Sequence, residues 1–163
     1  MQYYSVIGSN QVPKHYNVMM ETISKLFSKE DFILRTRGVL GFEEAALNGI
    51  TDYNKKIIVP GLDWNKIPPD KAYDIAWDNV PKWTKLAPRQ QKYKAYVVQT
   101  LLGHDLKSKS KFLITYTEDK DTIHEVNLAI RLAREYDIRV FDLAEYSFNR
   151  LWWDIMEIEK EAA

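Results

Sequence analysis

The sequence has 163 residues, of which 45% are hydrophobic and 28% charged, as expected for one globular domain with a full core. Lysine plus arginine and aspartate plus glutamate both number 23, so the formal net charge is zero, which argues against a protein that holds nucleic acid through its overall field. The absence of cysteine excludes disulfide bonds, thiolate nucleophiles and thiolate metal sites.

Apolar runs alternate with stretches of helical periodicity along the whole chain. We expect strands at residues 3–7, 32–35, 55–60, 111–116 and 138–141. We expect helices at residues 13–27, 43–48, 70–78, 89–102, 123–136 and about 144–161. This alternation predicts an α/β fold, a three-layer Rossmann-like domain with a mainly parallel sheet of about five strands. There is no repeat or linker, so residues 1–163 are expected to form a single domain.

Two strand-to-helix turns contain glycines in positions that suit a ligand. The first turn, residues 8–10, reads Gly8-Ser9-Asn10, and the second carries Gly38 and Gly41. Peptide N–H groups in such turns point at a bound group, and glycine allows positive φ and close approach. The two turns predict a ligand crevice at the carboxyl edge of the sheet. A turn without a ligand, or tight packing of a helix against a strand at Gly41, would explain the same glycines.

The order of these motifs resembles the SLOG superfamily of Rossmann-like proteins, which includes the Smf/DprA DNA-processing proteins and the LOG phosphoribohydrolases. Gly8-Ser9 matches its first turn, and residues 37–43, Arg-Gly-Val-Leu-Gly-Phe-Glu, stand where the family has a Gly-Gly-x-x-Gly-x-Asp-like turn. Residues 101–106, 110–117 and 129–133 are similar to its small stand-alone members, several of which are carried by bacteriophages. The resemblance implies a nucleotide-type ligand at the carboxyl edge.

One motif departs from the family. His124-Glu125-Val126 stands where the family places Gly-Gly-Thr, so the helix there begins with a negative charge where an anion would bind. The Pro-Gly-Gly-x-Gly-Thr-x-x-Glu signature of the LOG enzymes is also absent, which argues against their hydrolase activity.

The candidate site residues come from the turns and from the end of the strand at 111–116. The expected ligand-binding residues are Gly8, Ser9, Asn10, Arg37, Gly38, Gly41, Glu43, Thr115 and Thr117. Ser9 could donate to a phosphate or cap the first helix. Arg35 and Arg37 could clamp a phosphate, but for Arg35 an exposed ion pair with Glu43 or Glu44 is favoured. Glu43 and Glu118 are the candidate catalytic carboxylates, and for Glu43 a stabilising role at a helix start is the favoured alternative.

The remaining histidines and tryptophans suggest structural roles. His15, His104 and His124 lack metal-ligand spacing, so we expect no metal and no cofactor. Trp64, Trp77 and Trp83 could stack on a base, although anchoring of a long loop is favoured. Trp152 and Trp153 are adjacent on a helix, so one should face away from the core, which favours a homo-oligomer.

Three functions remain open after these observations. The favoured one is a binding module that senses or sequesters a nucleotide-derived small molecule. The alternatives are a hydrolase of an N-glycosidic or phosphoribosyl bond and a partner of single-stranded DNA, which the neutral charge disfavours. No apolar stretch approaches a membrane span and residues 1–4 do not begin a signal peptide, so a cytoplasmic location is expected.

Overall fold

The protein is described by a computed structural model that covers residues 2–60, 67–117 and 124–162. Its strands form one sheet in the order β3-β2-β1-β4-β5, and every neighbouring pair is parallel. The strands are β1 Gln2–Val6, β2 Phe32–Thr36, β3 Lys56–Ile58, β4 Phe112–Thr115 and β5 Arg139–Asp142. The predicted fold class, an α/β Rossmann-like domain with a parallel sheet, is confirmed.

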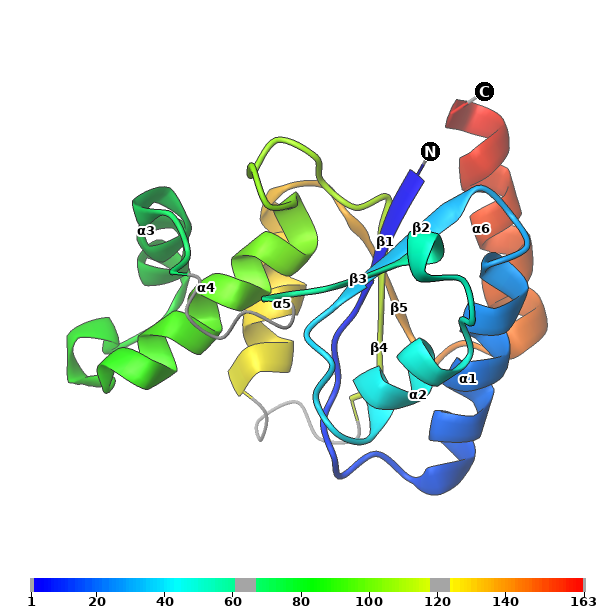
Figure 1. Cartoon of the computed structure of the whole chain (residues 1–163), viewed down its shortest axis with the longest axis horizontal. Coiled ribbons are helices and arrows are strands. Elements are labelled where there is room, and N and C mark those ends of the chain that lie inside the picture. The colour runs from blue at the N-terminus through cyan, green and yellow to red at the C-terminus, as the bar shows by residue number, and fades with distance from the viewer. Residues whose placement is uncertain (1, 61–66, 118–123, 163) are drawn as a thin grey trace.

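Helices cover both faces of the sheet. They are α1 Lys14–Phe27, α2 Phe42–Asn48, α3 Asp70–Asn79, α4 Pro88–Leu102, α5 His124–Glu135 and α6 Phe148–Ala162. Figure 1 shows α1, α2 and α6 on one side of the sheet and α3, α4 and α5 on the other. Two short 3₁₀ helices, η1 Tyr53–Lys55 and η2 Trp83–Lys85, lie in the connections.

The alternation of side chains along each strand divides the core into two clusters. In β4, Phe112 and Ile114 belong to the cluster beneath α1, α2 and α6, whereas Leu113 belongs to the cluster beneath α3, α4 and α5. All three side chains are fully buried, as expected for a strand at an inner position of a sheet covered on both faces. This double burial explains why the strand reads as a continuous apolar run.

The element boundaries follow local signals. Pro88 opens α4, and Gly103, with φ +89°, ends it. The last helix begins at Phe148, four residues later than the expected residue 144, because residues 144–146 fold back onto the end of β5. There the Asp142 carbonyl accepts from the N–H groups of Glu145 and Tyr146, while the Asp142 carboxylate accepts from Ala144 N–H.

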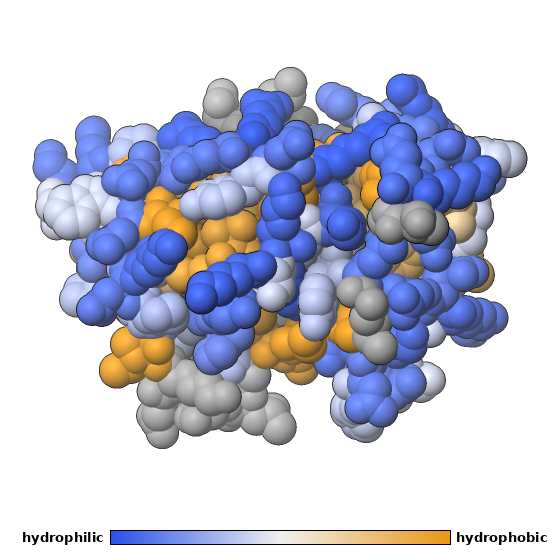
Figure 2. Space-filling model, turned by 90° about the horizontal axis from the view of Figure 1, so that it is seen from above, coloured by the Kyte–Doolittle hydropathy of each residue, from blue (hydrophilic) through white to orange (hydrophobic). Residues whose placement is uncertain are grey.

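The tryptophans occupy different environments. Trp152 stacks on Phe27 with ring centroids 5.4 Å apart, whereas Trp153 is 67% exposed, so the expectation that one of the two faces away from the core is confirmed. Trp83 is buried in the core and Trp77 is exposed, while Trp64 lies outside the described residues. Seen from above, the surface is mainly hydrophilic and its hydrophobic side chains gather in patches (Figure 2). None of the helices in the described part of the chain is long and apolar enough to cross a membrane.

Candidate ligand site at the carboxyl edge of the sheet

The two glycine-containing turns lie against each other because β1 and β2 are parallel neighbours. Phe42 N–H, at the start of α2, donates to the carbonyl of Ser9 over 3.2 Å. A Cβ atom placed on Gly41, whose φ is +95°, would lie 2.7 Å from both Asn10 Cα and Ser9 O. A Cβ atom on Gly8 would lie 2.5 to 2.8 Å from the Phe42 side chain. Gly8 and Gly41 are therefore required for turn-to-turn packing; for Gly41 this is a contact between two turns and not the expected one between a helix and a strand.

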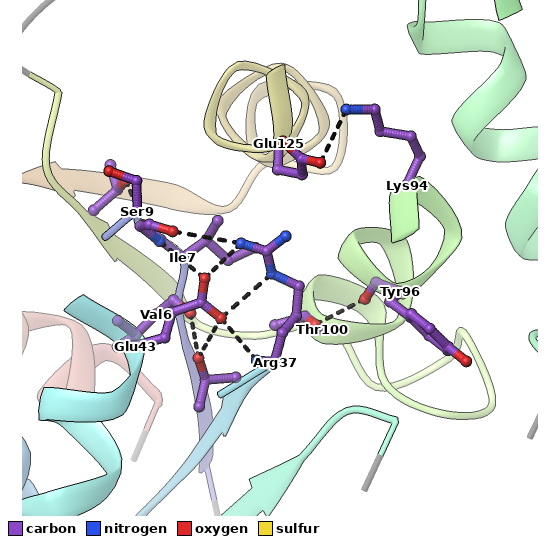
Figure 3. A network of polar contacts seen from close by, with 12 residues as sticks. Val6, Ile7, Ser9, Arg37, Glu43, Lys94, Tyr96, Thr100 and Glu125 are labelled. Carbon is purple, nitrogen blue, oxygen red and sulfur yellow. Dashed lines mark hydrogen bonds and ion pairs between the residues drawn. The ribbon is translucent and has the colours of Figure 1, made fainter. Parts of the chain in front are cut away.

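A buried ion pair holds the two turns together. The Glu43 side chain is fully buried at the start of α2, and its Oε2 accepts from Arg37 Nη2 over 2.5 Å and from Gly8 N–H over 3.2 Å. Its Oε1 accepts from Thr36 Oγ1, Arg37 N–H and Arg37 Nε over 2.9, 2.9 and 3.3 Å. Figure 3 shows this network. Five donors thus occupy the two oxygens, which favours a structural role for Glu43 over a catalytic one.

Arg35 contradicts the expectation of an exposed ion pair with Glu43 or Glu44. Arg35 is only 3% exposed, and burial lowers the pKa of its guanidinium group to about 10. Thr36 turns toward Glu43, so the alternation along β2 places Arg35 on the opposite face of the sheet, against α4. The expected pair was wrong because successive residues of a strand cannot face the same helix.

A cavity of about 440 Å³ opens beside the two turns. It is lined by Gly8, Ser9, Asn10, Arg37, Gly38, Val39, Val59, Pro60, Tyr93, Tyr96 and Glu125. Among the described residues, no acceptor is bound by the peptide N–H groups of Ser9, Asn10, Gly38 and Val39. Gly38 has φ +77°, the conformation that glycine was expected to supply in this turn. The cavity therefore combines free peptide donors from both turns with two tyrosine rings from α4.

Four of the expected ligand residues do not line this cavity. Gly41 and Glu43 pack between the turns, as described above. Thr115 is buried and donates to the Ile7 carbonyl over 2.6 Å. Thr117 is bound to Asp142, both through its hydroxyl and through its N–H over 3.0 Å. The other candidate carboxylate, Glu118, lies outside the described residues.

Ser9 does not cap the first helix. Helix α1 begins at Lys14, and the Ser9 hydroxyl oxygen instead accepts from Gln11 N–H over 3.1 Å, within the turn. The helix-capping alternative for Ser9 was therefore wrong. The reason is that three residues lie between Ser9 and Pro13, the residue that precedes the helix, so Ser9 is too far from the first helical turn to cap it.

A second ion pair forms the opposite wall of the cavity. Glu125, in the first turn of α5, lies 3.3 Å from the ammonium of Lys94, which is almost fully buried. Burial alone would raise the pKa of Glu125. The charge of Lys94, a hydrogen bond from the backbone N–H of Glu125 itself and the charge of Arg37 together outweigh burial and hold that pKa below the ordinary value of 4.5. In Figure 3 the Arg37 guanidinium lies between the Glu43 carboxylate and the Lys94–Glu125 pair. Both ionised groups that line the cavity, Arg37 and Glu125, thus have a partner of opposite charge.

Tyr93 and Tyr96 were not predicted as site residues. They lie three apart on α4, with ring centroids 6.5 Å apart. The signal that could have indicated them is compositional, because residues 82–94 contain five lysines and arginines and no acidic residue. Arg89 lies over the Tyr93 ring and Lys92 over the Tyr96 ring, at 5.4 and 5.9 Å from the centroids. A basic segment with interleaved aromatics is one type of surface that binds nucleotides and single strands.

The fold and the paired turns define a Rossmann-like domain with a cavity at the carboxyl edge of its sheet. No protein-family profile matches the chain, and no curated protein matches it in sequence. Among solved structures, it is similar to DNA processing protein A from Helicobacter pylori, reported for its single-stranded DNA binding mode, with a TM-score of 0.58 at 15% identity. The match covers 86% of this chain and 64% of that one. At this identity the likeness shows the fold, which is of the DprA-like Rossmann type.

Proposed function

We propose that the protein binds a nucleotide-derived small molecule in the cavity at the carboxyl edge and acts as a sensor or a sequestering protein. The observation that carries this proposal is the convergence of unbound peptide donors from two turns with the rings of Tyr93 and Tyr96 in one cavity. Its volume of about 440 Å³ is in the range of small-molecule sites.

The lining suggests how the ligand lies. A phosphate or carbonyl oxygen would accept from the N–H groups of residues 9–10 and 38–39, and the base would lie against the two tyrosine rings. The carboxylate of Glu125 would accept from sugar hydroxyls. Because Arg37 is already paired with Glu43, and Glu125 repels anions, we expect a ligand with one phosphate or none rather than a polyphosphate.

A hydrolase that cleaves the bond between base and sugar is less well supported. Glu43 is enclosed and fully hydrogen-bonded, so it has no lone pair directed at a substrate. Glu125 is the carboxylate among the lining residues, and its lowered pKa keeps it ionised at neutral pH. An ionised carboxylate cannot protonate a leaving group, which is the role that such a reaction requires of its acid.

Single-stranded DNA is the second candidate ligand, favoured by the basic segment 82–94 and by the reported DNA binding of the structural neighbour. Lys82, Lys85 and Arg89 are exposed on this segment. A strand that followed them would reach Tyr93 and Tyr96, where one base could enter the cavity. The two candidates therefore differ in whether phosphates beyond the cavity contribute to binding.

Calorimetric titration with a set of nucleosides and mononucleotides, and with a thymidine oligonucleotide, tests both candidates. A small-molecule ligand should bind with little dependence on salt, whereas binding of the oligonucleotide should weaken steeply as salt rises. Replacing Lys82 and Lys85 together with glutamine should weaken only the oligonucleotide, because both side chains are exposed and neither lines the cavity. If no nucleoside, nucleotide or oligonucleotide binds at millimolar concentration, the proposed function is wrong.

Gly38→Val tests the position of the ligand. A Cβ atom at Gly38 would lie at ordinary distances from Leu47 and Ile58, 3.4 and 3.6 Å, so the substitution fits sterically but is strained at φ +77°. We expect the affinity to fall at least tenfold, about 1.4 kcal/mol, with a loss of only a few degrees in the thermal midpoint. Leu40→Ala, on the same turn but outside the cavity lining, is the matched control and should bind normally.

A further inference from the structure

A second cavity, of about 510 Å³, lies on the α4 side of β2 and β3. One part of its lining is apolar and comes from β3 and the residues that follow it: Ile57, Ile58, Val59, Pro60, Ile67 and Pro68. The other part is polar and includes the side chain of Arg35. The two cavities share Val59, Pro60 and Tyr96, but Arg35 lines only the second.

Arg35 is a buried cation that forms no ion pair with any described residue, although the charge of Asp105 acts on it from a distance. Its Nη2 donates to three neutral acceptors, Leu101 O, Ser108 O and Ser110 Oγ, over 3.3, 2.5 and 2.8 Å. Its Nε is buried and, like Nη1, has no acceptor within the described parts of the chain. No carboxylate there lies within ion-pair distance of the guanidinium. A buried cation without an ion-pair partner destabilises the folded protein unless an anion binds beside it.

The groups around Arg35 do not supply that anion. The ring of Tyr3 lies under the guanidinium, 4.5 Å from its centre, and stabilises one face of it. Asp105 also lines the cavity, but its Oδ1 accepts from Lys107 N–H and Ser108 Oγ over 3.0 and 3.2 Å. Its carboxylate is therefore held by its own loop and contributes a negative charge at the cavity without pairing with Arg35.

We propose that this second cavity binds a small organic anion, with its carboxylate or phosphate group at Arg35 and its apolar body against the isoleucines of β3. A purely structural role for Arg35 would be satisfied by the three bonds of Nη2 alone. It would not explain why Nη1, which is not among the buried atoms, also lacks an acceptor in the described chain while Arg35 lines an open cavity. The cavity has a cationic side chain on one side and apolar side chains on the other. These two sides match the anionic group and the apolar body of the proposed ligand.

The resonance of the Arg35 Nε–H group in a ¹H–¹⁵N spectrum provides a direct test in the full-length protein. The Nε–H signal that is missing from the spectrum of the Arg35→Lys variant is the one that belongs to Arg35. Benzoate and phenyl phosphate should shift the signal in a saturable manner, with dissociation constants of about 1 mM for ligands of this size. Benzyl alcohol, which has the same ring without the charge, should not shift it. The relative affinity of benzoate and phenyl phosphate distinguishes a carboxylate from a phosphate ligand.

Asp105→Asn is the matched variant, because an asparagine keeps the bond from Lys107 N–H and removes the charge. It should strengthen the binding of both anions by about twofold to threefold, since the site is exposed to screening by salt. Glu125→Gln, which changes the first cavity and is absent from the lining of the second, should leave both titrations unchanged, so failure of one proposal does not decide the other. If neither anion moves the Arg35 signal at tens of millimolar, or if benzyl alcohol moves it equally, the guanidinium is a structural clamp and the proposal is wrong.

Discussion

Replacing Glu43 with glutamine would test whether the buried ion pair, rather than the glycines alone, holds the two turns of the site together. The substitution keeps the shape of the side chain but exchanges one oxygen for an amide NH₂ group. The remaining oxygen can still accept from Thr36 and from the backbone of Arg37. The NH₂ group, however, must then face Gly8 N–H and the Arg37 Nη2 group, both of which are donors.

The expected loss of stability is large because the partner is left buried. The side chain of Arg37 is only 11% exposed, so loss of its counter-charge leaves a cation that water reaches poorly. Removing one member of a buried pair typically costs about 3–5 kcal/mol. For a chain of this length, about 2–4 °C of thermal midpoint corresponds to each kcal/mol, so Glu43→Gln should lower the midpoint by roughly 6–20 °C.

Thermal and urea unfolding, followed by circular dichroism, would measure this loss. Glu44→Gln is the control, since Glu44 is the exposed neighbour in the same helical turn and should cost about 0.5 kcal/mol or less. A double variant, Glu43→Gln with Arg37→Met, should recover part of the loss because the unpaired charge is removed. If Glu43→Gln costs less than about 1 kcal/mol, the carboxylate does not hold the turns. If Glu43→Gln were fully stable but lost a catalytic activity, Glu43 would instead be a catalytic residue.

Three further predictions concern other parts of the molecule. The Tyr4 hydroxyl is buried without a partner among the described residues, so Tyr4→Phe should leave the urea midpoint unchanged or raise it, and a clear loss would show that the hydroxyl is satisfied. Trp153→Ala should shift a homo-oligomer toward monomer in light scattering, whereas a monomeric native protein would contradict the predicted assembly. Burial raises the pKa of Glu125, but Lys94, the backbone N–H of Glu125 and Arg37 together hold it below 4.5. The stabilisation that the ionised carboxylate contributes is therefore complete above pH 4.5 and is lost as the pH falls through the folded pKa. The stability difference between the native protein and Glu125→Gln should therefore shrink in acid, and a difference that stayed constant from neutral to strongly acidic pH would refute this.

The fold could be predicted because its signals are local. Most strands contain an apolar run, and a helix such as α5 has a buried periodic face, where Val126, Ala129, Leu132 and Ala133 are buried. The start of α6 was misplaced because residues 144–146 are held by hydrogen bonds to Asp142, a contact that periodicity does not encode. The local pattern of apolar residues thus predicts which helices and strands form, whereas hydrogen bonds in the neighbouring turns determine where they begin.

The site could be predicted only in part because its walls come from distant parts of the chain. The turns after β1 and β2 have glycine signatures, and they do lie together at the edge of the sheet. Tyr93 and Tyr96 reach the cavity only through the crossover that carries the chain from β3 to β4 across β2 and β1, and the same crossover brings Lys94 to Glu125. The basic composition of residues 82–94 could indicate a binding surface there, but it does not indicate that this surface lies beside the two turns. The face of the sheet to which Arg35 turns likewise depends on where α2 and α4 pack.

The two ion pairs around the cavity suggest a physical reason why His124-Glu125-Val126 replaces the Gly-Gly-Thr motif of the family. Arg37 is neutralised by Glu43, so an incoming phosphate gains little from it beyond what the peptide N–H groups supply. Glu125 stands on the opposite wall and remains ionised because Lys94 is beside it. Each additional phosphate would therefore be repelled by the charge of Glu125 without gaining a new ion pair, which lowers the affinity. The affinity of an uncharged nucleoside would not be lowered in this way. Selectivity of this kind arises from repulsion of the wrong ligand, so Glu125→Gln should improve the binding of nucleoside polyphosphates more than that of nucleosides.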